Sequence, residues 1–397
     1  MRASDGRGKI ITMIKNKITK IRKDKFGPEN VVEVHNPEIG MKGFLVIDNT
    51  VLGPGKGGVR MTESVDVTEV FRLARVMTFK NALAELPFGG AKAGIVWKGG
   101  SPELKKQFIQ SFAEEIKYLI PEKYIAGPDV NTGEKEMQWF AEATNNWKSA
   151  TGKPKNVCCK VCDKSGIVKE QCGLPHEYGS TGFGVAQATK IAIGLKGLDI
   201  KETKIAIHGF GNVGTFTYKI LTQMGAKIIA LSDLSATIFE KDGFDYEIIE
   251  KIINDRKTLS NYPKGEKISP EEFWALPSDV LIPASVTDVI NEKNKNEIIS
   301  KIIVEAGNIP MSESIEEELF GKGILIVPDL IANAGGVISS YCECKGHSSE
   351  EMFEIIEKKI TRNVEIVLEE SLKKNKNPRE IAFQIARERI EEKTKEV

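Results

Sequence analysis

Three lysines follow one another closely in stretches of small and apolar residues, where a charged side chain is unusual. They are Lys56 in GPGKGGVR, Lys80 in MTFKNA and Lys92 in PFGGAKAG. Each could be a surface charge among glycines that punctuate turns, because lysine usually stays in water. The three together, with glycines that let the backbone close on Lys92, instead favour a pocket lined by ammonium groups. Such a pocket would hold an anion.

Acid–base chemistry is the second expectation for this pocket. A lysine in a low-dielectric cleft beside other cations loses proton affinity and can act as a base near neutral pH, which makes Lys92 the candidate base. Asp129, in IAGPDVNT, is the candidate partner that would shuttle the proton. Its alternative role is to cap a turn or the helix predicted to open near Thr132. That helix would bury one face, made of Met137, Phe140, Ala141 and Thr144.

A third pattern, KIAIHGFGNVG at residues 204–214, predicts a phosphate-binding turn. A short apolar strand runs into a glycine-rich turn and then into a helix that reaches about Met224. Glycine permits the tight turn and the close approach of a pyrophosphate, whose charge the helix N-terminus stabilises. A second predicted strand ends in Asp233, about 20 residues past the last glycine, where the dinucleotide fingerprint places an acid for a ribose hydroxyl. These features predict a nicotinamide-dinucleotide site that contains Gly209, Gly211, Asn212, Val213, Gly214 and Asp233.

The motifs KGGVR, MTFKNA, PFGGAKAGI, GPDVNT, TGKP, GFGNVG and ANAGGV resemble those of the glutamate/leucine/phenylalanine/valine dehydrogenase family, in the same order, from about Val31 to Ser340. The resemblance implies oxidative deamination of an L-amino acid to a 2-oxo acid and ammonium, with hydride transfer to NAD or NADP. We expect an α/β protein with two domains, an N-terminal α/β substrate-binding and oligomerisation domain and a Rossmann-type doubly wound dinucleotide-binding domain. The expected boundaries are 1–178, with a cysteine-rich insertion at 156–176, then 179–345, and 346–397 for C-terminal helices that return to the first domain.

Residue roles also follow from the resemblance. Lys92 matches the lysine that activates the water attacking the imino intermediate, and Asp129 matches the acid that moves protons to and from the amine. Lys80 matches the lysine that binds the substrate α-carboxylate. The expected substrate site further contains Gly57, Gly58, Asn333, Val337 and Ser340. At the cofactor, the resemblance adds Thr181 near the nicotinamide end, and the carboxyl ends of later strands are expected to bring Ala284, Ser285 and Asn308 to the cleft.

The substrate is expected to be glutamate. In glutamate-specific members, the lysine that corresponds to Lys56 and the serine that corresponds to Ser340 bind the side-chain carboxylate, whereas branched-chain and aromatic members generally lack that lysine. An apolar side chain would gain nothing from a desolvated ammonium. A branched-chain substrate, leucine or valine, is the alternative. Residues 33–48 look more like the leucine dehydrogenase branch, and PHEYGSTG stands where glutamate enzymes usually carry an arginine.

Four cysteines and a histidine gather in the insertion that follows TGKP. Their spacing, which includes a Cys-x-x-Cys, is that of a small zinc knuckle using four of the five residues Cys158, Cys159, Cys162, Cys172 and His176. Reduced thiols on a loop are one alternative, and a disulfide in an oxidising compartment is another. A metal-sensing regulatory protein on a dehydrogenase fold is therefore the function hypothesis of a different class. Cys342 and Cys344 are expected to be small packing residues of a helix.

Composition sets limits on partners and location. The 56 basic and 56 acidic residues leave no net charge, so nothing in the balance favours nucleic acid over a small-molecule amino acid as partner. No apolar run approaches the roughly 20 residues needed to span a membrane. Six cysteines without a secretory leader favour a cytoplasmic location. The basic N-terminus favours a helix or arm over a transit peptide, which would need more serine. The resemblance implies a homo-oligomer, a hexamer or an octamer, and Asp233 favours NAD over NADP because it repels a 2′-phosphate.

Alternating strands and helices must position these groups. A helix at Val67–Leu83 is predicted with Asp66 and Glu69 as a capping box. A second helix, at Pro102–Leu119, has Ser101 as its N-cap and proline at its first position. Strands are expected at 31–34, 43–48, 227–233, 279–283, 302–305 and 324–328, and charged amphipathic helices at 350–373 and 378–396.

Overall fold

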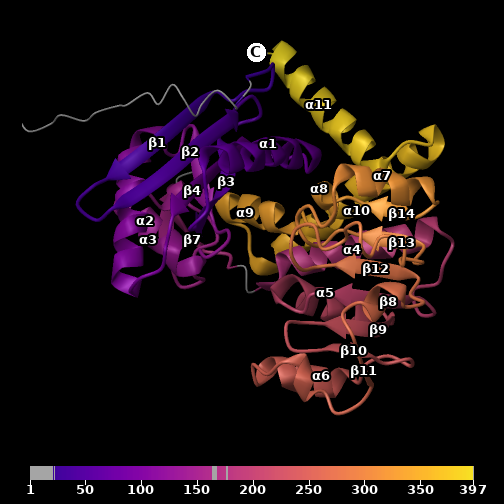
Figure 1. The fold of residues 1–397 in the computed structure, drawn as a ribbon. Coiled ribbons are helices and arrows are strands. Elements are labelled where there is room, and N and C mark those ends of the chain that lie inside the picture. Colours follow the sequence, from indigo (N-terminus) through magenta and orange to yellow (C-terminus); the bar gives the residue numbers. More distant parts are fainter. Residues whose placement is uncertain (1–20, 22, 163–167, 176–177, 397) are drawn as a thin grey trace, which may run out of the picture.

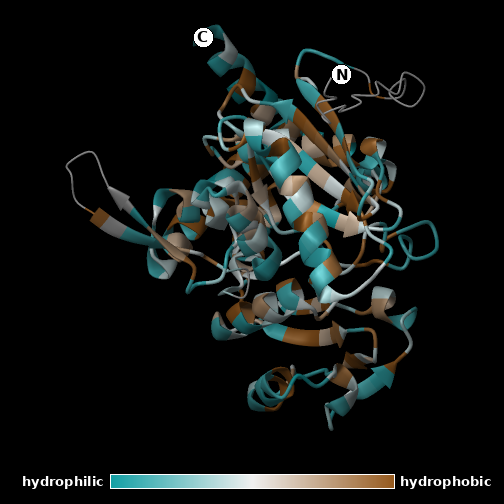
Figure 2. Cartoon of the chain, turned by 90° about the vertical axis from the view of Figure 1, so that its left-hand side faces the viewer, coloured by the Kyte–Doolittle hydropathy of each residue, from teal (hydrophilic) through white to brown (hydrophobic). Residues whose placement is uncertain are grey.

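The computed structural model describes residues 21, 23–162, 168–175 and 178–396. Figure 1 shows two lobes, each built on its own sheet, with helices α8 and α9 between them and α11 reaching from the second lobe towards the first. Figure 2 shows hydrophobic residues concentrated in the strands and hydrophilic ones on the outward surfaces of the helices. The predicted N-terminal arm lies almost entirely outside the described residues.

The first sheet has the strand order β1-β2-β4-β3-β5. Strand β4 pairs in parallel with β3 and antiparallel with β2, and β3 pairs in parallel with β5. Helix α1 covers one face, where its Val70 and Ala74 pack against Phe44 and Val46 of β2, and helices α2 and α3 cover the other. The strands are β1 (Asn30–Asn36), β2 (Met41–Asn49), β3 (Gly55–Thr62), β4 (Gly89–Val96) and β5 (Tyr124–Gly127), and the helices are α1 (Val67–Leu83), α2 (Pro102–Ile116), η2 (Lys117–Leu119), α3 (Glu134–Thr144) and η3 (Trp147–Ser149).

The second sheet has the strand order β11-β10-β9-β8-β12-β13-β14. Neighbouring strands pair in parallel through β9, β8, β12, β13 and β14, while β10 pairs antiparallel with β9 and β11. Because β9 and β12 flank β8 on opposite sides, the order reverses at β8, which is where ligands bind in open α/β sheets. The strands are β8 (Lys204–His208), β9 (Lys227–Ser232), β10 (Thr237–Phe239), β11 (Glu266–Ile268), β12 (Val280–Pro283), β13 (Ile302–Val304) and β14 (Leu325–Val327).

The helices of the second lobe join it to the first. Phe383 of α11 packs edge-on against Phe79 of α1 at 5.3 Å, and Arg389 of α11 donates to the carbonyl oxygens of Ala82 and Leu83 at the end of α1. One hydrophobic core therefore runs from α1 into the second sheet. The helices are α4 (Ser180–Leu195), α5 (Asn212–Gln223), α6 (Tyr246–Asn254), η5 (Leu259–Asn261), η6 (Glu272–Ala275), α7 (Glu313–Gly321), α8 (Asp329–Ala332), α9 (Gly335–Lys345), α10 (Ser349–Lys374) and α11 (Pro378–Glu396).

A separate two-stranded hairpin, β6 (Cys158–Cys162) with β7 (Val168–Cys172), lies between the lobes in the sequence. Figure 2 shows it projecting from the body of the protein. The cysteine-rich insertion is therefore a β-hairpin rather than a loop. Among the helices that the structure describes, none combines the length and the apolar character needed to cross a membrane.

Sequence signals at helix ends are confirmed where a side chain sets the boundary. Asp66 Oδ1 accepts from the Glu69 amide at 2.9 Å, and Ser101 Oγ accepts from the Leu104 amide. The Glu69 side chain, however, binds Arg60 instead of completing a capping box. Helix α2 ends three residues earlier than predicted, in the 3₁₀ turn η2. Thr144, predicted to be buried, is half-exposed at the end of α3.

Candidate active site

The first sheet presents cationic side chains on one of its faces. Successive residues of a strand point to opposite faces, so Lys56 and Arg60 of β3 share a face. The parallel register pairs Arg60 with Gly94, which places Lys92 of β4 on that same face. Val59 and other apolar residues of these strands lie on the opposite face, under α2 and α3. The alternation of β3 and β4 thus separates the charges from the core.

Asp129 binds two of these cations. Its Oδ2 accepts a hydrogen bond from Lys92 Nζ, and its Oδ1 accepts one from Arg60 Nε at 2.8 Å. Burial alone would raise the pKa of Asp129, but the charges and hydrogen bonds of Lys92 and Arg60 hold that pKa well below its usual range. The carboxylate is therefore ionised at neutral pH, the form that can accept a proton.

Glycine at position 58 lets Asp129 come close to β3. A β-carbon at Gly58 would lie 2.6 Å from the Pro128 carbonyl oxygen and 2.8 Å from the Asp129 β-carbon. The Asp129 amide donates to Thr132 Oγ1, which itself donates to the Val59 carbonyl. The N-cap of α3 is Gly133, so the alternative prediction in which Asp129 caps this helix is wrong.

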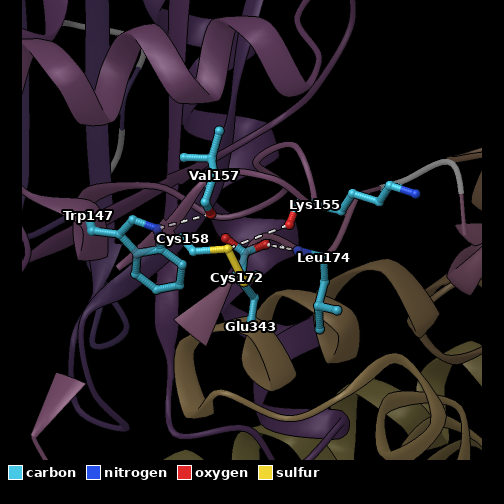
Figure 3. The surroundings of a disulfide bond; sticks show 7 residues. All are labelled: Trp147, Lys155, Val157, Cys158, Cys172, Leu174 and Glu343. Atoms are coloured by element: carbon cyan, nitrogen blue, oxygen red, sulfur yellow. Dashed lines mark hydrogen bonds between the residues drawn. A yellow bond between two sulfur atoms is a disulfide. The ribbon is translucent and has the colours of Figure 1, made fainter. Parts of the chain in front are cut away.

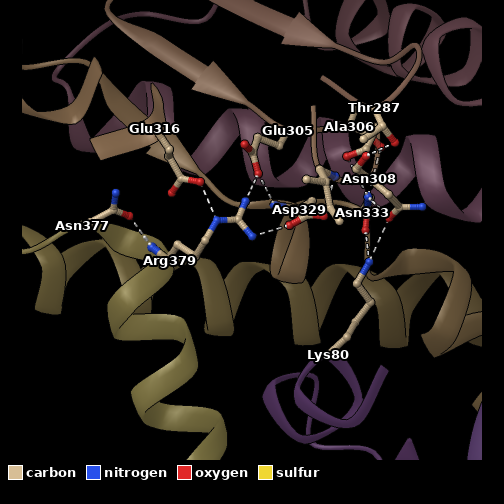
Figure 4. A network of polar contacts seen from close by, with 12 residues as sticks. Lys80, Thr287, Glu305, Ala306, Asn308, Glu316, Asp329, Asn333, Asn377 and Arg379 are labelled. Atoms are coloured by element: carbon tan, nitrogen blue, oxygen red, sulfur yellow. Dashed lines mark hydrogen bonds and ion pairs between the residues drawn. The ribbon is translucent and has the colours of Figure 1, made fainter. Parts of the chain in front are cut away.

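Lys80 connects the two lobes. It lies on α1 and is buried, so its reading as a surface charge is wrong. Its Nζ donates to Asn333 Oδ1 at 2.6 Å and to Asn308 Oδ1 at 3.3 Å, both in the second lobe. Burial is the largest cause that lowers the pKa of Lys80, and the charges of Lys92 and Arg379 lower it further, whereas Asp329 opposes them. Figure 4 shows the ammonium group of Lys80 pointing at the two asparagines.

Lys56 and Ser340 lie in one neighbourhood, although they come from different lobes. Lys56 is buried, and its Nζ donates to the Ala126 carbonyl at 2.7 Å. The same carbonyl accepts from the Thr151 amide, and Thr151 Oγ1 donates to Ser340 Oγ at 3.0 Å. An ammonium and a hydroxyl thus lie on either side of Thr151. This pair can bind a carboxylate.

Burial dominates the titration of Lys56. It lowers the pKa of Lys56 from 10.5 to about 8; Cys344 and Glu343 oppose this shift, while Lys153 and Lys92 add to it. The described contacts supply one carbonyl oxygen and no carboxylate within ion-pair distance of this ammonium. A bound anion would therefore supply the missing counter-charge.

The glycine-rich turn between β8 and α5 can hold a pyrophosphate. Gly209 has a φ of +101°, and a β-carbon there would lie 2.8 Å from the Ala284 carbonyl oxygen. A β-carbon at Gly214 would lie 2.0 Å from the Gly209 carbonyl oxygen, so glycine brings α5 against β8. At Gly211, the N-cap of α5, a β-carbon would meet no other part of the described chain within 4 Å. That open space at a helix N-terminus suits a phosphate.

The other predicted cofactor residues lie at the same edge of the sheet. Ser285 follows β12, and its Oγ lies 2.8 Å from Nδ1 of His208 at the end of β8. A β-carbon at Gly335, which begins α9, would lie 2.0 Å from the Ser180 carbonyl oxygen, so α9 packs against the start of α4. The remaining positions are Thr181 in the first turn of α4, Asn212 and Val213 in the first turn of α5, and Asn308 after β13.

Asp233 follows β9, as predicted, but its carboxylate is already engaged by the protein. Oδ1 accepts from the amides of Ser235 and Ala236, and Oδ2 accepts from the Leu259 amide at 2.9 Å. Burial would raise the pKa of Asp233, but these hydrogen bonds, that of Leu259 first, hold the pKa below its usual value. A fixed negative charge therefore stands at the end of β9.

In the cysteine-rich hairpin, Cys158 and Cys172 face each other across the two strands and form a disulfide (Figure 3). Their sulfur atoms and a carboxylate oxygen of Glu170 all lie within 4.8 Å of one another. Cys159, a free cysteine, is not part of this group, because neighbouring strand residues point to opposite faces. The side chain of Cys162 and all of His176 lie outside the described residues.

The base of the hairpin is joined to α9 through Glu343. Its Oε2 accepts from the Leu174 amide at 2.9 Å (Figure 3). The same oxygen accepts from the Gly152 amide at 2.7 Å, and Oε1 pairs with the fully buried Lys153 at 2.6 Å. Gln171 also donates to the carbonyl oxygens of Glu343 and Cys344. The segment that carries Thr151 is thus fixed to the helix that carries Ser340.

Some functional groups escaped prediction from the sequence. Arg60 stands in the KGGVR motif, and two-residue alternation would have placed it on the same strand face as Lys56, had the stretch been recognised as a strand. Within the part of the chain that the structure describes, no hydrogen bond joins Gly57 or Val337 to Lys56, Lys80 or Lys92. A β-carbon at Gly57 would lie 1.7 Å from the Ala91 carbonyl oxygen, which shows tight packing of β3 on β4. Val337 is half-buried near the start of α9.

Comparison with known proteins shows similarity to one family of dehydrogenases along most of the chain. Residues 28–146 match the family model described as Glu/Leu/Phe/Val dehydrogenase, dimerisation domain, and residues 172–397 match Glutamate/Leucine/Phenylalanine/Valine dehydrogenase. A glutamate dehydrogenase of Aeropyrum pernix is 37% identical over 363 residues, which cover 86% of this chain and 83% of that protein. An NADP-specific glutamate dehydrogenase of Saccharolobus shibatae is 35% identical over 338 residues, covering 81% and 77%. Among solved structures, the hetero-hexameric glutamate dehydrogenase of Thermus thermophilus in a leucine-bound form has a TM-score of 0.79 at 26% identity, covering 93% of this chain and 89% of that one.

Proposed function

This chain belongs to the glutamate/leucine/phenylalanine/valine dehydrogenase family, and we propose that it oxidises L-glutamate to 2-oxoglutarate and ammonium with a nicotinamide dinucleotide as hydride acceptor. The observation that carries the choice of glutamate is the buried ammonium of Lys56, which lacks a carboxylate partner among the described ion pairs. Its ammonium is linked to Ser340 through the Ala126 carbonyl and Thr151. A leucine or valine side chain would leave that charge desolvated and unpaired, which is costly.

The residues divide the reaction between them. Lys80 binds the α-carboxylate, and Lys56 with Ser340 binds the side-chain carboxylate, so that the α-carbon lies near Lys92. A nicotinamide dinucleotide held at the glycine-rich turn of Gly209, Gly211 and Gly214 would supply the acceptor for the hydride of that carbon. Asp129 takes a proton from the substrate amine, Lys92 helps a water molecule to add to the resulting imine, and Asp129 returns a proton to the departing nitrogen. Arg60 keeps the Asp129 carboxylate oriented and ionised between these steps.

A steady-state screen tests the proposed substrate. Reduction of NAD and NADP would be followed with glutamate, leucine, valine and phenylalanine in turn. We expect glutamate to have the highest kcat/KM. A preference for leucine or valine would instead support the branched-chain alternative, and absence of turnover with all four would contradict the proposed enzyme class.

The pH dependence should identify Lys56. Its pKa of about 8 in the free protein lies below the usual value, so the ammonium is present below about pH 8 and is lost as the pH rises through that value. We therefore expect kcat/KM for glutamate to fall above about pH 8. Norvaline, which has no side-chain carboxylate, is the control and should lack this decline. Parallel profiles for the two substrates, measured between about pH 6 and pH 10, would contradict the assignment.

The preferred cofactor is proposed to be NAD. The charge of Asp233, fixed by three backbone amides, would repel a 2′-phosphate. Replacing Asp233 by Ser should raise kcat/KM for NADP by about tenfold, the equivalent of about 1.4 kcal/mol, relative to NAD. The matched control is Glu240→Gln, because Glu240 is also a half-buried acid but lies outside the turn that follows β9. An unchanged NADP/NAD ratio in the Asp233→Ser protein would remove this residue from the cofactor site.

A zinc ion is the second proposal, favoured by the grouping of Cys158, Cys172 and Glu170. In a reducing cytoplasm, where we place the protein, the disulfide would open and its two thiolates could bind the ion, together with a further ligand from the same insertion. Zinc measured by mass spectrometry after purification under reductant should be about one per chain, and Cys172→Ser should lose it. Cys342→Ala, buried in α9, should retain it. Zinc-free wild-type protein would leave the disulfide as the only role of this pair.

Tight zinc binding without amino acid turnover would favour a regulatory protein instead. For the active enzyme, we propose a homo-oligomer, a hexamer by resemblance, formed through the first lobe. The match of residues 28–146 to a dimerisation domain supports this arrangement. Light scattering on the purified protein would give the number of chains.

A further inference from the structure

A cluster of three buried carboxylates surrounds Arg379 near the start of α11. Arg379 Nη1 donates to Asp329 Oδ1 at 2.9 Å and Nε donates to Glu316 Oε2 at 2.5 Å, while Nη2 donates to Glu305 Oε2. The side chains of Glu305 and Glu316 are completely buried, and that of Asp329 is almost so. One cation thus joins residues of α7, α8 and the end of β13 to the C-terminal helix (Figure 4).

The cluster contains three carboxyl groups, and the single positive charge of Arg379 cannot neutralise all of them. Glu305 Oε1 and Glu316 Oε1 are buried and have no hydrogen-bond partner in the described chain. Burial raises the pKa of Glu305 and of Glu316. The pKa of Asp329 is lowered instead, because the charges of Arg379 and Lys80 outweigh its burial. The negative charge of the cluster is therefore favoured most at Asp329.

Asp329 is connected to Asn308 and Asn333 of the active site in two ways. Its Oδ2 accepts from the Ile309 amide at 3.0 Å, and Ile309 directly follows Asn308. Asp329 also begins the single-turn helix α8, whose C-cap is Asn333. Asn333 Nδ2 donates to Asn308 Oδ1 at 3.0 Å, and both asparagines accept from Lys80 Nζ.

The backbone at Ile309 explains why an anchor is needed there. Its φ is +49°, in the left-handed region, which a β-branched residue rarely adopts. Such a conformation persists only where the surroundings hold it in place. The amide of Ile309 is held by Asp329, and Asp329 is held by Arg379.

We propose that Arg379 is a positioning residue for the α-carboxylate end of the substrate site: by clamping Asp329, it fixes Asn308 and Asn333, which orient the ammonium of Lys80. This inference rests on the proposed role of Lys80 in binding the substrate. Arg379 itself does not touch Lys80 among the described hydrogen bonds and acts through the loop at Ile309 and the short helix α8.

The test compares Arg379→Lys and Arg379→Met with wild type. The α-carboxylate is bound in the ground state and in the transition state alike, so its displacement should raise KM more than it lowers kcat. For Arg379→Lys we expect KM for glutamate to rise about tenfold while kcat changes less than about threefold. Arg379→Met should have a larger effect of the same kind. Lys376→Met, which removes an exposed ion pair beside α11, is the matched control and should leave both constants unchanged.

A second readout does not depend on turnover. Hydrogen exchange of the Ile309 amide should be faster in Arg379→Lys than in wild type, and not faster in Lys376→Met. In an Ile309→Gly background, where a positive φ carries no strain, Arg379→Lys should raise KM by a smaller factor. Unchanged KM and unchanged exchange at Ile309 in folded Arg379→Lys would overturn the proposal. If wild type fails to oxidise glutamate, the proposed function fails, and the exchange measurement still decides whether Arg379 holds the loop.

Discussion

Replacing Asp129 by Asn is expected to lower kcat for glutamate by a factor of about 10² to 10⁴, the usual contribution of a general acid or base. Asparagine has nearly the same shape but cannot take a proton from the amine or return one to it. Because Asp129 also neutralises Lys92 and Arg60, the substitution leaves two partly buried cations without their common partner. The loss should therefore appear in kcat and in stability together.

The control for this prediction is Glu69→Gln. Glu69 also binds Arg60, through Nη1 at 2.6 Å, but it does not touch Lys92. We expect its kcat to stay within a few-fold of wild type, because the Arg60–Glu69 pair is only partly buried and such pairs contribute little. Circular dichroism would establish that both variants are folded, and binding of NADH, followed by fluorescence, should persist in Asp129→Asn. A kcat for folded Asp129→Asn close to that of Glu69→Gln would remove Asp129 from the chemistry.

Replacing Lys56 by Leu is expected to lower kcat/KM for glutamate by a factor of about 10² to 10³. A hydrogen bond to a charged group contributes about 1.5–3 kcal/mol, and a substrate carboxylate buried without a partner adds a further penalty. For norvaline, kcat/KM should be unchanged or higher. The ratio of the two substrates in wild type and variant isolates the side-chain carboxylate from every other step.

The same substitution should stabilise the free protein. Moving the pKa of Lys56 from 10.5 to about 8 means that the fold disfavours the charged form by about 3 kcal/mol at neutral pH. The sign is that of a lysine with a depressed pKa: the unfolded chain binds more protons between about pH 8 and pH 10.5, so stability rises with pH across that range. Leucine carries no such charge. A rise of Tm with a fall in glutamate turnover would mark Lys56 as a residue kept for function, whereas a fall of both would indicate a structural role.

Local signals in the sequence determine some elements well. Helix α1 runs from Val67 to Leu83 as predicted, because Asp66 caps its first turn through a hydrogen bond that depends on side chains close in sequence. The glycines of the dinucleotide turn likewise follow from local geometry, since Gly209 needs a positive φ and Gly214 a close contact.

In strands β3 and β4, local sequence signals did not predict the structure, because the role of the glycines depends on tertiary packing. Their glycines, among them Gly57, Gly58 and Gly90, look like turn residues, yet they allow a buried sheet to pack tightly against its neighbours. A β-carbon at Gly90 would lie 2.0 Å from Thr78 Oγ1 of α1, a contact that only the tertiary fold creates. The partner of Lys92 could be predicted from family motifs, but the second cation on Asp129, Arg60, could not.

The ion pairs of Arg379 could not be predicted from local sequence at all. Its three partners lie 50 to 74 positions before Arg379 in the sequence, in α7, in α8 and directly after β13. The pairing of Cys158 with Cys172 is similar, because it depends on the register of a hairpin whose strands were not recognised.

A structure of the protein with 2-oxoglutarate and oxidised dinucleotide, a pair that cannot react, tests the central claim most directly. The account predicts the α-carboxylate within hydrogen-bond distance of Lys80 Nζ, the other carboxylate on Lys56 Nζ and Ser340 Oγ, and the keto carbon between Lys92 and the nicotinamide ring. A ligand bound away from these three lysines, or a keto carbon that neither Lys92 nor Asp129 can reach, would contradict it.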